Sequence, residues 1–195
     1  ADARRDVLGL RKLRRRDGKT CLHFAARYGR LACVKYLVED QLLTVDESSG
    51  DCTTPFHMAC FGSNVEAAEY LLSHGADINA TNEWGCNAAH WVAMTRNQST
   101  LEVRRFCSLL HNKGVSFIVK QKQGHTALHK AAHRKNQHVI EWIAQSAIDG
   151  GADLSADERR LAGLPDDGGH SPSDLWLGAG GDSDFGARMK TEWGW

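Results

Sequence analysis

The chain has 195 residues, of which 42% are hydrophobic and 25% are charged, with basic and acidic side chains equal at 24 each. This balance excludes a disordered chain, and the equal charges give no bulk attraction to nucleic acid or to an anionic membrane. No run of the sequence approaches the roughly 20 apolar residues of a membrane span.

The first residues predict a terminal cap. The sequence begins Ala-Asp-Ala with no initiating methionine and no apolar signal core, so we expect no secretory peptide and either a processed chain or an excerpt of a longer protein. Residues 1–16 are predicted to form a helix that packs Val7, Leu8, Leu10 and Leu13 on the rest of the fold. The basic run at residues 11–16 is interpreted as the solvated face of this helix; contact with RNA, an anionic membrane or an acidic partner is the alternative.

Charge is distributed unevenly between the two ends. Residues 1–20 carry eight basic and three acidic side chains, a net charge of +5, whereas residues 148–187 carry nine acidic and two basic ones, a net charge of −7. We expect this polarity to bias the orientation of a charged partner.

A nine-residue segment recurs four times along the chain. The copies are GKTCLHFAA (18–26), CTTPFHMAC (52–60), GCNAAHWVA (85–93) and GHTALHKAA (124–132). Their histidines, His23, His57, His90 and His129, follow one another at intervals of 34, 33 and 39 residues. A weaker fifth copy, GHSPSDLW (169–176), has Asp174 in place of the histidine. Such a period indicates an array of stacked repeats.

Each copy predicts a pair of helices. Thr20, Thr54 and Thr126 precede apolar runs, where a hydroxyl can accept a hydrogen bond from the free amides of a helix start. Apolar residues then recur at helical spacing, which predicts second helices over residues 31–39, 65–72, 101–112 and 137–147. Because each pair has two apolar sides, stacking is what stabilises it.

The four segments resemble the ankyrin repeat, whose TPLHxAA segment recurs at about 33 residues. The third copy departs most, with Asn87, Ala88 and Ala89 in place of Thr-Pro-Leu. The resemblance covers residues 17–147 well and 166–193 loosely. It implies an all-α solenoid of helix–turn–helix pairs linked by short hairpin loops, with about four full repeats and degenerate terminal caps.

The predicted organisation has four parts: an N-terminal cap helix (1–16), repeats one to four (17–147), an insertion (148–168), and a degenerate fifth repeat with a C-terminal cap (169–195). The insertion contains a capped helix start at Ser155. A second insertion lengthens the third copy around residues 96–100. Both are interpreted as exposed loops or as determinants of specificity. The last helix pair is expected to bury Leu175, Trp176, Phe185, Met189 and Trp193.

The polar residues that recur in the motif are interpreted as structural residues. The resemblance implies that each histidine bonds the backbone and the hydroxyl before its helix; the residues concerned are Thr20, His23, Thr54, His57, His90, Thr126 and His129. His125, His129 and His133, spaced four apart, offer a metal site as the alternative, but we expect no metal and no cofactor. No nucleophile elbow, zinc-protease or phosphate-loop motif is present, so the chain is predicted not to be an enzyme.

The resemblance implies that a protein partner lies along the concave side, against the hairpin tips and the ends of the first helices. The predicted protein-binding residues are Arg27, Tyr28, Phe61, Glu83, Trp84, Met94, Lys122, His133 and Arg134. Tyrosine, tryptophan and arginine are enriched in interface hot spots. By contrast Phe24, Met58 and Trp91, which directly follow the histidines, are expected in the core.

The function predicted is that of a non-catalytic adaptor or scaffold: a monomer that binds a protein of unknown identity, with no nucleic acid or membrane partner. The alternative is a targeting or regulatory segment of a larger enzyme or channel whose active domain lies outside this chain. The six cysteines contain no CxxC pair, so we expect free thiols and a reducing compartment, the cytoplasm or, as the alternative, the nucleus.

Overall fold

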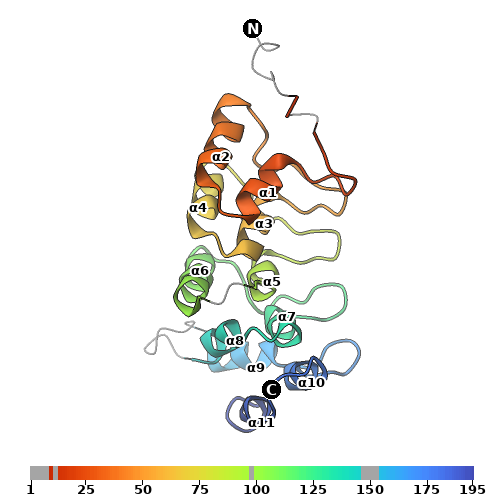
Figure 1. Cartoon of the computed structure of the whole chain (residues 1–195). Coiled ribbons are helices and arrows are strands. Elements are labelled where there is room, and N and C mark those ends of the chain that lie inside the picture. The colour runs from red at the N-terminus through yellow and green to blue at the C-terminus, as the bar shows by residue number, and fades with distance from the viewer. Residues whose placement is uncertain (1–8, 11–12, 97–98, 146–153) are drawn as a thin grey trace.

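Helix pairs stack one after another along the chain, as Figure 1 shows for a computed structural model that describes residues 9–10, 13–96, 99–145 and 154–195. The first helices of the pairs are α1 (Cys21–Arg27), α3 (Pro55–Gly62), α5 (Ala88–Ala93), α7 (Ala127–Arg134) and α10 (Pro172–Gly178). The second helices are α2 (Leu31–Lys35) with the π-helical segment η2 (Tyr36–Asp40), α4 (Val65–Ser73), α6 (Thr100–Asn112), α8 (Gln137–Ala144) and α11 (Ser183–Thr191). The predicted all-α solenoid is confirmed.

The first and second helices form two adjacent columns. Hairpin loops project from the column of first helices, on the side away from the second helices (Figure 1). We call the surface where the first helices meet these hairpins the inner face. None of the described helices has both the length and the apolar character needed to cross a membrane.

Each first helix begins at a polar residue, as the motif predicts. The N-cap residues are Thr20, Thr54, Asn87, Thr126 and Ser171. Three residues later a histidine, or Asp174 in the fifth pair, accepts a hydrogen bond from the N-cap amide and completes a capping box. Asn87 therefore caps α5 although the third copy departs most from the motif.

The hairpin tips form a ladder of backbone hydrogen bonds along the array. The amides of Gly50, Glu83 and Lys122 donate to the carbonyls of Asp17, Asp51 and Trp84, at 2.9, 3.0 and 3.0 Å. The amide of Asp167 extends the ladder to the carbonyl of Gln123 at 3.3 Å. The fifth hairpin is thus built like the others, and it begins at Asp166, slightly before the predicted boundary at residue 169.

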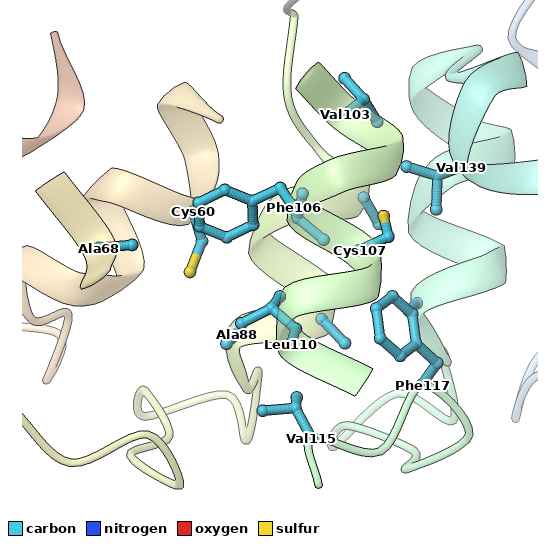
Figure 2. Packing of buried hydrophobic residues seen from close by; sticks show 14 of the residues in the cluster. Cys60, Ala68, Ala88, Val103, Phe106, Cys107, Leu110, Val115, Phe117 and Val139 are labelled. Carbon is cyan, nitrogen blue, oxygen red and sulfur yellow. The ribbon is translucent and has the colours of Figure 1, made fainter. Parts of the chain in front are cut away.

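The core runs between the helix columns and across successive pairs. Figure 2 shows Phe106 of α6 directed toward Cys60 of α3, with Phe117 on the other side of α6. Phe117 packs against Trp142 of α8, with ring centroids 4.8 Å apart. Small residues such as Ala59 and Ala88 are fully buried and let neighbouring helices approach closely. Each pair therefore buries its apolar sides against its neighbours, as a repeat array requires.

Asparagine side chains join successive repeats. The side-chain amide of Asn64, between α3 and α4, donates to the carbonyls of Ala26 and Arg27 at 3.0 and 2.7 Å. Asn136, between α7 and α8, donates to the carbonyl of Ala93 at 3.3 Å. These bonds give a partner to the carbonyls of Arg27 and Ala93, near the end of the preceding first helix, whereas the Ala26 carbonyl also accepts from the Gly29 amide.

The predicted N-terminal cap helix is corrected in part. Residues 1–8 and 11–12, which include Val7 and Leu8, lie outside the described residues. Residues 13–16 are not helical, because Arg14 pairs with Thr20 in an isolated antiparallel bridge that opens the first hairpin. Leu13 is 60% exposed, so it does not pack on the first repeat.

The C-terminal pair agrees with the sequence more closely. Helices α10 and α11 bury Trp176, Phe185 and Met189, and the rings of Trp176 and Phe185 lie 4.6 Å apart. Within the predicted insertion, α9 (Ala156–Ala162) begins at Ser155 with a capping box to Glu158. Residues 146–153 and, in the other insertion, residues 97–98 lie outside the described residues.

The predicted second helices need small corrections. The helix expected over residues 31–39 changes to π-helical geometry at Tyr36. The helix expected over residues 137–147 ends at Ala144 within the described residues. Helices α4 and α6 lie within one residue of their predicted bounds.

Candidate protein-binding surface

The four motif histidines take part in the scaffold. The Nδ1 of His23 accepts a hydrogen bond from the Thr20 amide at 3.1 Å, and its Nε2 donates to the carbonyl of Thr53 in the next hairpin at 2.9 Å. His57 and His90 bond in the same way to the carbonyls of Ala80 and His125. Each of these three histidines therefore joins a helix start to the following repeat, and its ring needs to be neutral to accept at Nδ1 and donate at Nε2.

Burial keeps these rings neutral. It lowers the pKa of His57 and of His90 to about 4, and that of His129 likewise to about 4, because a charged imidazole loses its hydration inside the fold. The Nε2 of His129 lies near the His170 carbonyl without forming the hydrogen bond that the other histidines make. None of the four is available for chemistry at the surface.

The structure does not bring the three-histidine alternative together as a metal site. His125 stacks on His129 with ring centroids 5.7 Å apart, and its Nε2 contacts the Asp166 carboxylate at 2.9 Å. His133 is exposed at the end of α7. Among the described residues no group of three or more His, Cys, Asp or Glu side chains has the arrangement of a metal site.

A hollow of about 340 Å³ opens on the inner face between repeats two, three and four. First helices and two successive hairpins contribute its walls. The lining residues are Phe61, Asn82, Trp84, Cys86, Trp91, Met94, Gln121, Gln123, Lys130 and Arg134. We call this feature the central hollow. Its lining combines aromatic and other apolar side chains with amides and two cations, and concave sites where polar groups are placed beside apolar ones are common binding sites.

Aromatic rings give the central hollow its apolar wall. Phe61 meets Trp91 edge to face, with centroids 6.2 Å apart and an interplanar angle of 80°, and His57 stacks on Trp91 at 5.7 Å. Trp84, at the tip of the third hairpin, is 46% exposed. An exposed tryptophan beside further aromatic groups is typical of an interaction surface.

An arginine extends the aromatic row toward the first repeat. The Arg27 guanidinium lies 4.8 Å from the Phe61 ring centroid and 5.5 Å from that of Tyr28, within the range of a cation–π contact. Tyr28 is 61% exposed. It lines a different hollow of about 490 Å³ at the N-terminal end of the stack, together with Leu10 and Tyr36.

The predicted binding residues therefore fall into three groups. Phe61, Trp84, Met94 and Arg134 line the central hollow. Arg27 and Tyr28 continue the row from Phe61. The remaining three, Glu83, Lys122 and His133, are exposed but do not line the central hollow.

Two important residues of the central hollow were not among the predicted protein-binding residues. Trp91 and Phe24, both expected in the core, are only partly buried, and Trp91 lines the hollow, whereas Met58 is buried as expected. Lys130, which has the same position in the fourth copy, lies there too. The missed signal was the variation at this position, which holds Phe24, Met58, Trp91 and Lys130 beside the small residues that follow in each copy.

The six cysteines are all described, and none forms a disulfide. Burial raises the pKa of the Cys60 and Cys107 thiols, so both stay protonated and unreactive. They are packed in the core as small apolar side chains.

Comparison with known families places this architecture in a class. A family model described as ankyrin repeats in three copies matches residues 6–82, and one described as an ankyrin repeat matches residues 123–157. The chain belongs to the ankyrin-repeat family.

Three curated relatives share parts of the chain. Ankyrin repeat domain-containing protein 53 of Homo sapiens is 39% identical over 80 residues, covering 39% of this chain and 15% of that protein. Protein phosphatase 1 regulatory subunit 27 of Homo sapiens is 41% identical over 71 residues, covering 35% of this chain and 44% of that protein. Alpha-latrotoxin-Lg1a of Latrodectus geometricus is 34% identical over 122 residues, covering 63% of this chain and 8% of that protein. The chain thus matches less than half of the length of each relative.

Proposed function

We propose that the chain is a non-catalytic adaptor or scaffold that binds a protein partner through the inner face. The observation that carries the proposal is the central hollow, with Trp84 exposed at its rim beside Phe61 and Trp91. Ankyrin repeats generally mediate contacts between proteins. The hairpin ladder positions Trp84, while α3 and α5 position Phe61 and Trp91, and a preformed surface lowers the ordering cost of binding.

Two further observations support a non-catalytic role. The motif histidines His23, His57 and His90 use their Nε2 atoms for backbone hydrogen bonds. One relative is named a regulatory subunit of protein phosphatase 1, and this name supports a non-catalytic role. None of the six cysteines forms a disulfide, which favours a reducing compartment such as the cytoplasm.

The test is comparative capture. The purified chain, its Trp84→Ala variant and its Leu101→Ala variant are immobilised, and bound proteins are quantified by mass spectrometry. Leu101 is 78% exposed on α6, in the column of second helices, so its variant is a matched control for loss of an exposed apolar side chain. We expect some proteins to be retained by the wild type and by Leu101→Ala but lost by Trp84→Ala. The binding of each such protein is then verified with purified material. Equal recovery by all three would contradict the proposal.

A further inference from the structure

The charged groups of the central hollow are all of one sign. Lys130 and Arg134 lie four residues apart on α7, hence on one side of the helix. None of the residues that line the hollow is an aspartate or a glutamate. The remaining polar groups there are neutral: the side-chain amides, the Cys86 thiol and the indole N–H groups of Trp84 and Trp91.

These two cations have no acidic partner within the described residues. Ion pairs elsewhere join Lys190 to Asp174 at 3.1 Å and Arg105 to Glu66 at 3.4 Å, but none involves Lys130 or Arg134. Partial burial lowers the pKa of Lys130. Of its titratable neighbours, the Cys86 thiol raises this pKa and Arg134 lowers it. A partly desolvated cation next to a like charge is destabilised, and a nearby anion would relieve both effects.

We propose that the central hollow binds an acidic segment of a protein partner, seating an apolar side chain against Phe61 and Trp84 while a carboxylate of the same segment pairs with Lys130 and Arg134. This inference rests on the proposed function and names the chemistry of the partner. Charge complementarity selects the occupant, since a basic or neutral segment would leave the two cations unpaired. A guanidinium also matches the geometry of a carboxylate.

The size of the hollow agrees with one anchor side chain. A volume of about 340 Å³ is at the small end of the range for ligand pockets. It accommodates one large apolar side chain with a flanking acidic residue, and the partner segment would continue across the hairpin tips in either direction.

The experiment selects binders from a peptide-display library on the immobilised full chain, and measures the affinity of a selected peptide by fluorescence anisotropy. The variants are Lys130→Met, which keeps the apolar stem, and Arg134→Gln, with Lys113→Gln as control because Lys113 is an exposed cation after α6. Thermal melts establish that each variant is folded. Arg134 is exposed, so its variant tests the idea even if Lys130→Met fails to fold.

We expect selected peptides that pair aspartate or glutamate with an aromatic or aliphatic residue. Each hollow variant should weaken binding by about tenfold or more, whereas Lys113→Gln should change it less than about twofold. Replacing the acidic residues of the peptide by amides should have the same effect as removing the cations, and added salt should weaken wild-type binding.

Several results would overturn the inference: no enriched peptide, selected peptides without acidic residues, or full affinity in Lys130→Met and Arg134→Gln. An oligouridine RNA that displaced the peptide at lower concentration would also overturn it, since bases stack on aromatic rings beside cations. The two proposals fail differently. If Trp84→Ala abolishes binding and the cation variants do not, the inner face binds a partner but the acidic assignment is wrong.

Discussion

At the scale of single residues, the left-handed position of each hairpin shows how closely the repeats share one backbone. Gly18, Gly85, Gly124 and Gly169 have φ between 77° and 82°, and Cys52 holds the equivalent position with φ at 59°. A residue with a Cβ atom is strained in this region. The second repeat therefore carries a local cost that its neighbours avoid.

Replacing Cys52 by glycine should relieve this strain. Because the side chain of Cys52 is exposed, little packing is lost, and we expect Cys52→Gly to raise the free energy of unfolding by up to about 1 kcal/mol. Urea denaturation of the two proteins measures the difference. The reverse change, Gly85→Cys, should lower stability, and a loss of stability in Cys52→Gly would refute the explanation.

The buried histidines should make stability depend on pH. Burial lowers the pKa of His57 to about 4, while in the unfolded chain it returns to about 6.5. Between these two pKa values the unfolded state binds a proton that the folded state does not bind. The contribution of His57 to the free energy of unfolding is therefore complete above pH 6.5 and is lost as the pH falls toward 4.

His57→Gln removes one of these groups from the titration. Each buried histidine contributes a slope of up to about 1.4 kcal/mol per pH unit in this window, so the variant should show a flatter fall of unfolding free energy between neutral and mildly acidic pH. Its stability at neutral pH should be lower, since the capping box and the bond to Ala80 are altered. An unchanged slope in urea titrations would show that His57 is not buried in its neutral form.

At the scale of elements, hydrogen bonds between repeats contribute to the stability of the array. Asn64→Ala removes the donor for the carbonyl of Arg27 and one of the donors for that of Ala26, which also accepts from the Gly29 amide. We expect a loss of about 1–3 kcal/mol because the partly buried Arg27 acceptor is left without a partner. Asn79→Ala, at an exposed asparagine in the next loop, is the control and should stay within about 0.5 kcal/mol of wild type. Equal effects of the two variants would contradict this role.

Local sequence signals predicted most of these elements. Capping residues located the helix starts, and Ser155 did so within the predicted insertion. The terminal helix was wrong over residues 13–16 because the apolar spacing of Leu10 and Leu13 competes with the hairpin that leads into Thr20. The π-helical segment η2 has no signal in the period, since its geometry depends on packing against neighbouring elements.

The binding surface was harder to predict than the fold. Trp84 and Met94 could be placed on the inner face from their motif positions, and the structure brings both into the central hollow. Lys130 was missed because its hollow is shared by three repeats, and a position within one repeat does not reveal what its neighbours contribute. The separation of Tyr28 from the hollow likewise depends on how the first two repeats stack.

At the scale of the whole molecule, the array presents a surface that differs along its length. The first repeat contributes Tyr28 and Arg27. The second and third repeats contribute the aromatic side chains of the central hollow, and the fourth repeat contributes the two cations of the hollow. Because each repeat contacts only its neighbours, a partner that spans several repeats would also stabilise their stacking. We propose, as the central claim, that such a partner binds at the central hollow.

The most direct test is calorimetric titration of one purified partner, obtained by the capture experiment, into the wild type, Trp84→Ala and Leu101→Ala. Truncation of a hot-spot tryptophan costs about 2 kcal/mol or more. We therefore predict that Trp84→Ala binds at least about 30-fold more weakly, while Leu101→Ala stays within about twofold of wild type. If Trp84→Ala binds as tightly as wild type, or if Leu101→Ala loses more affinity, the partner binds elsewhere and the central claim is wrong.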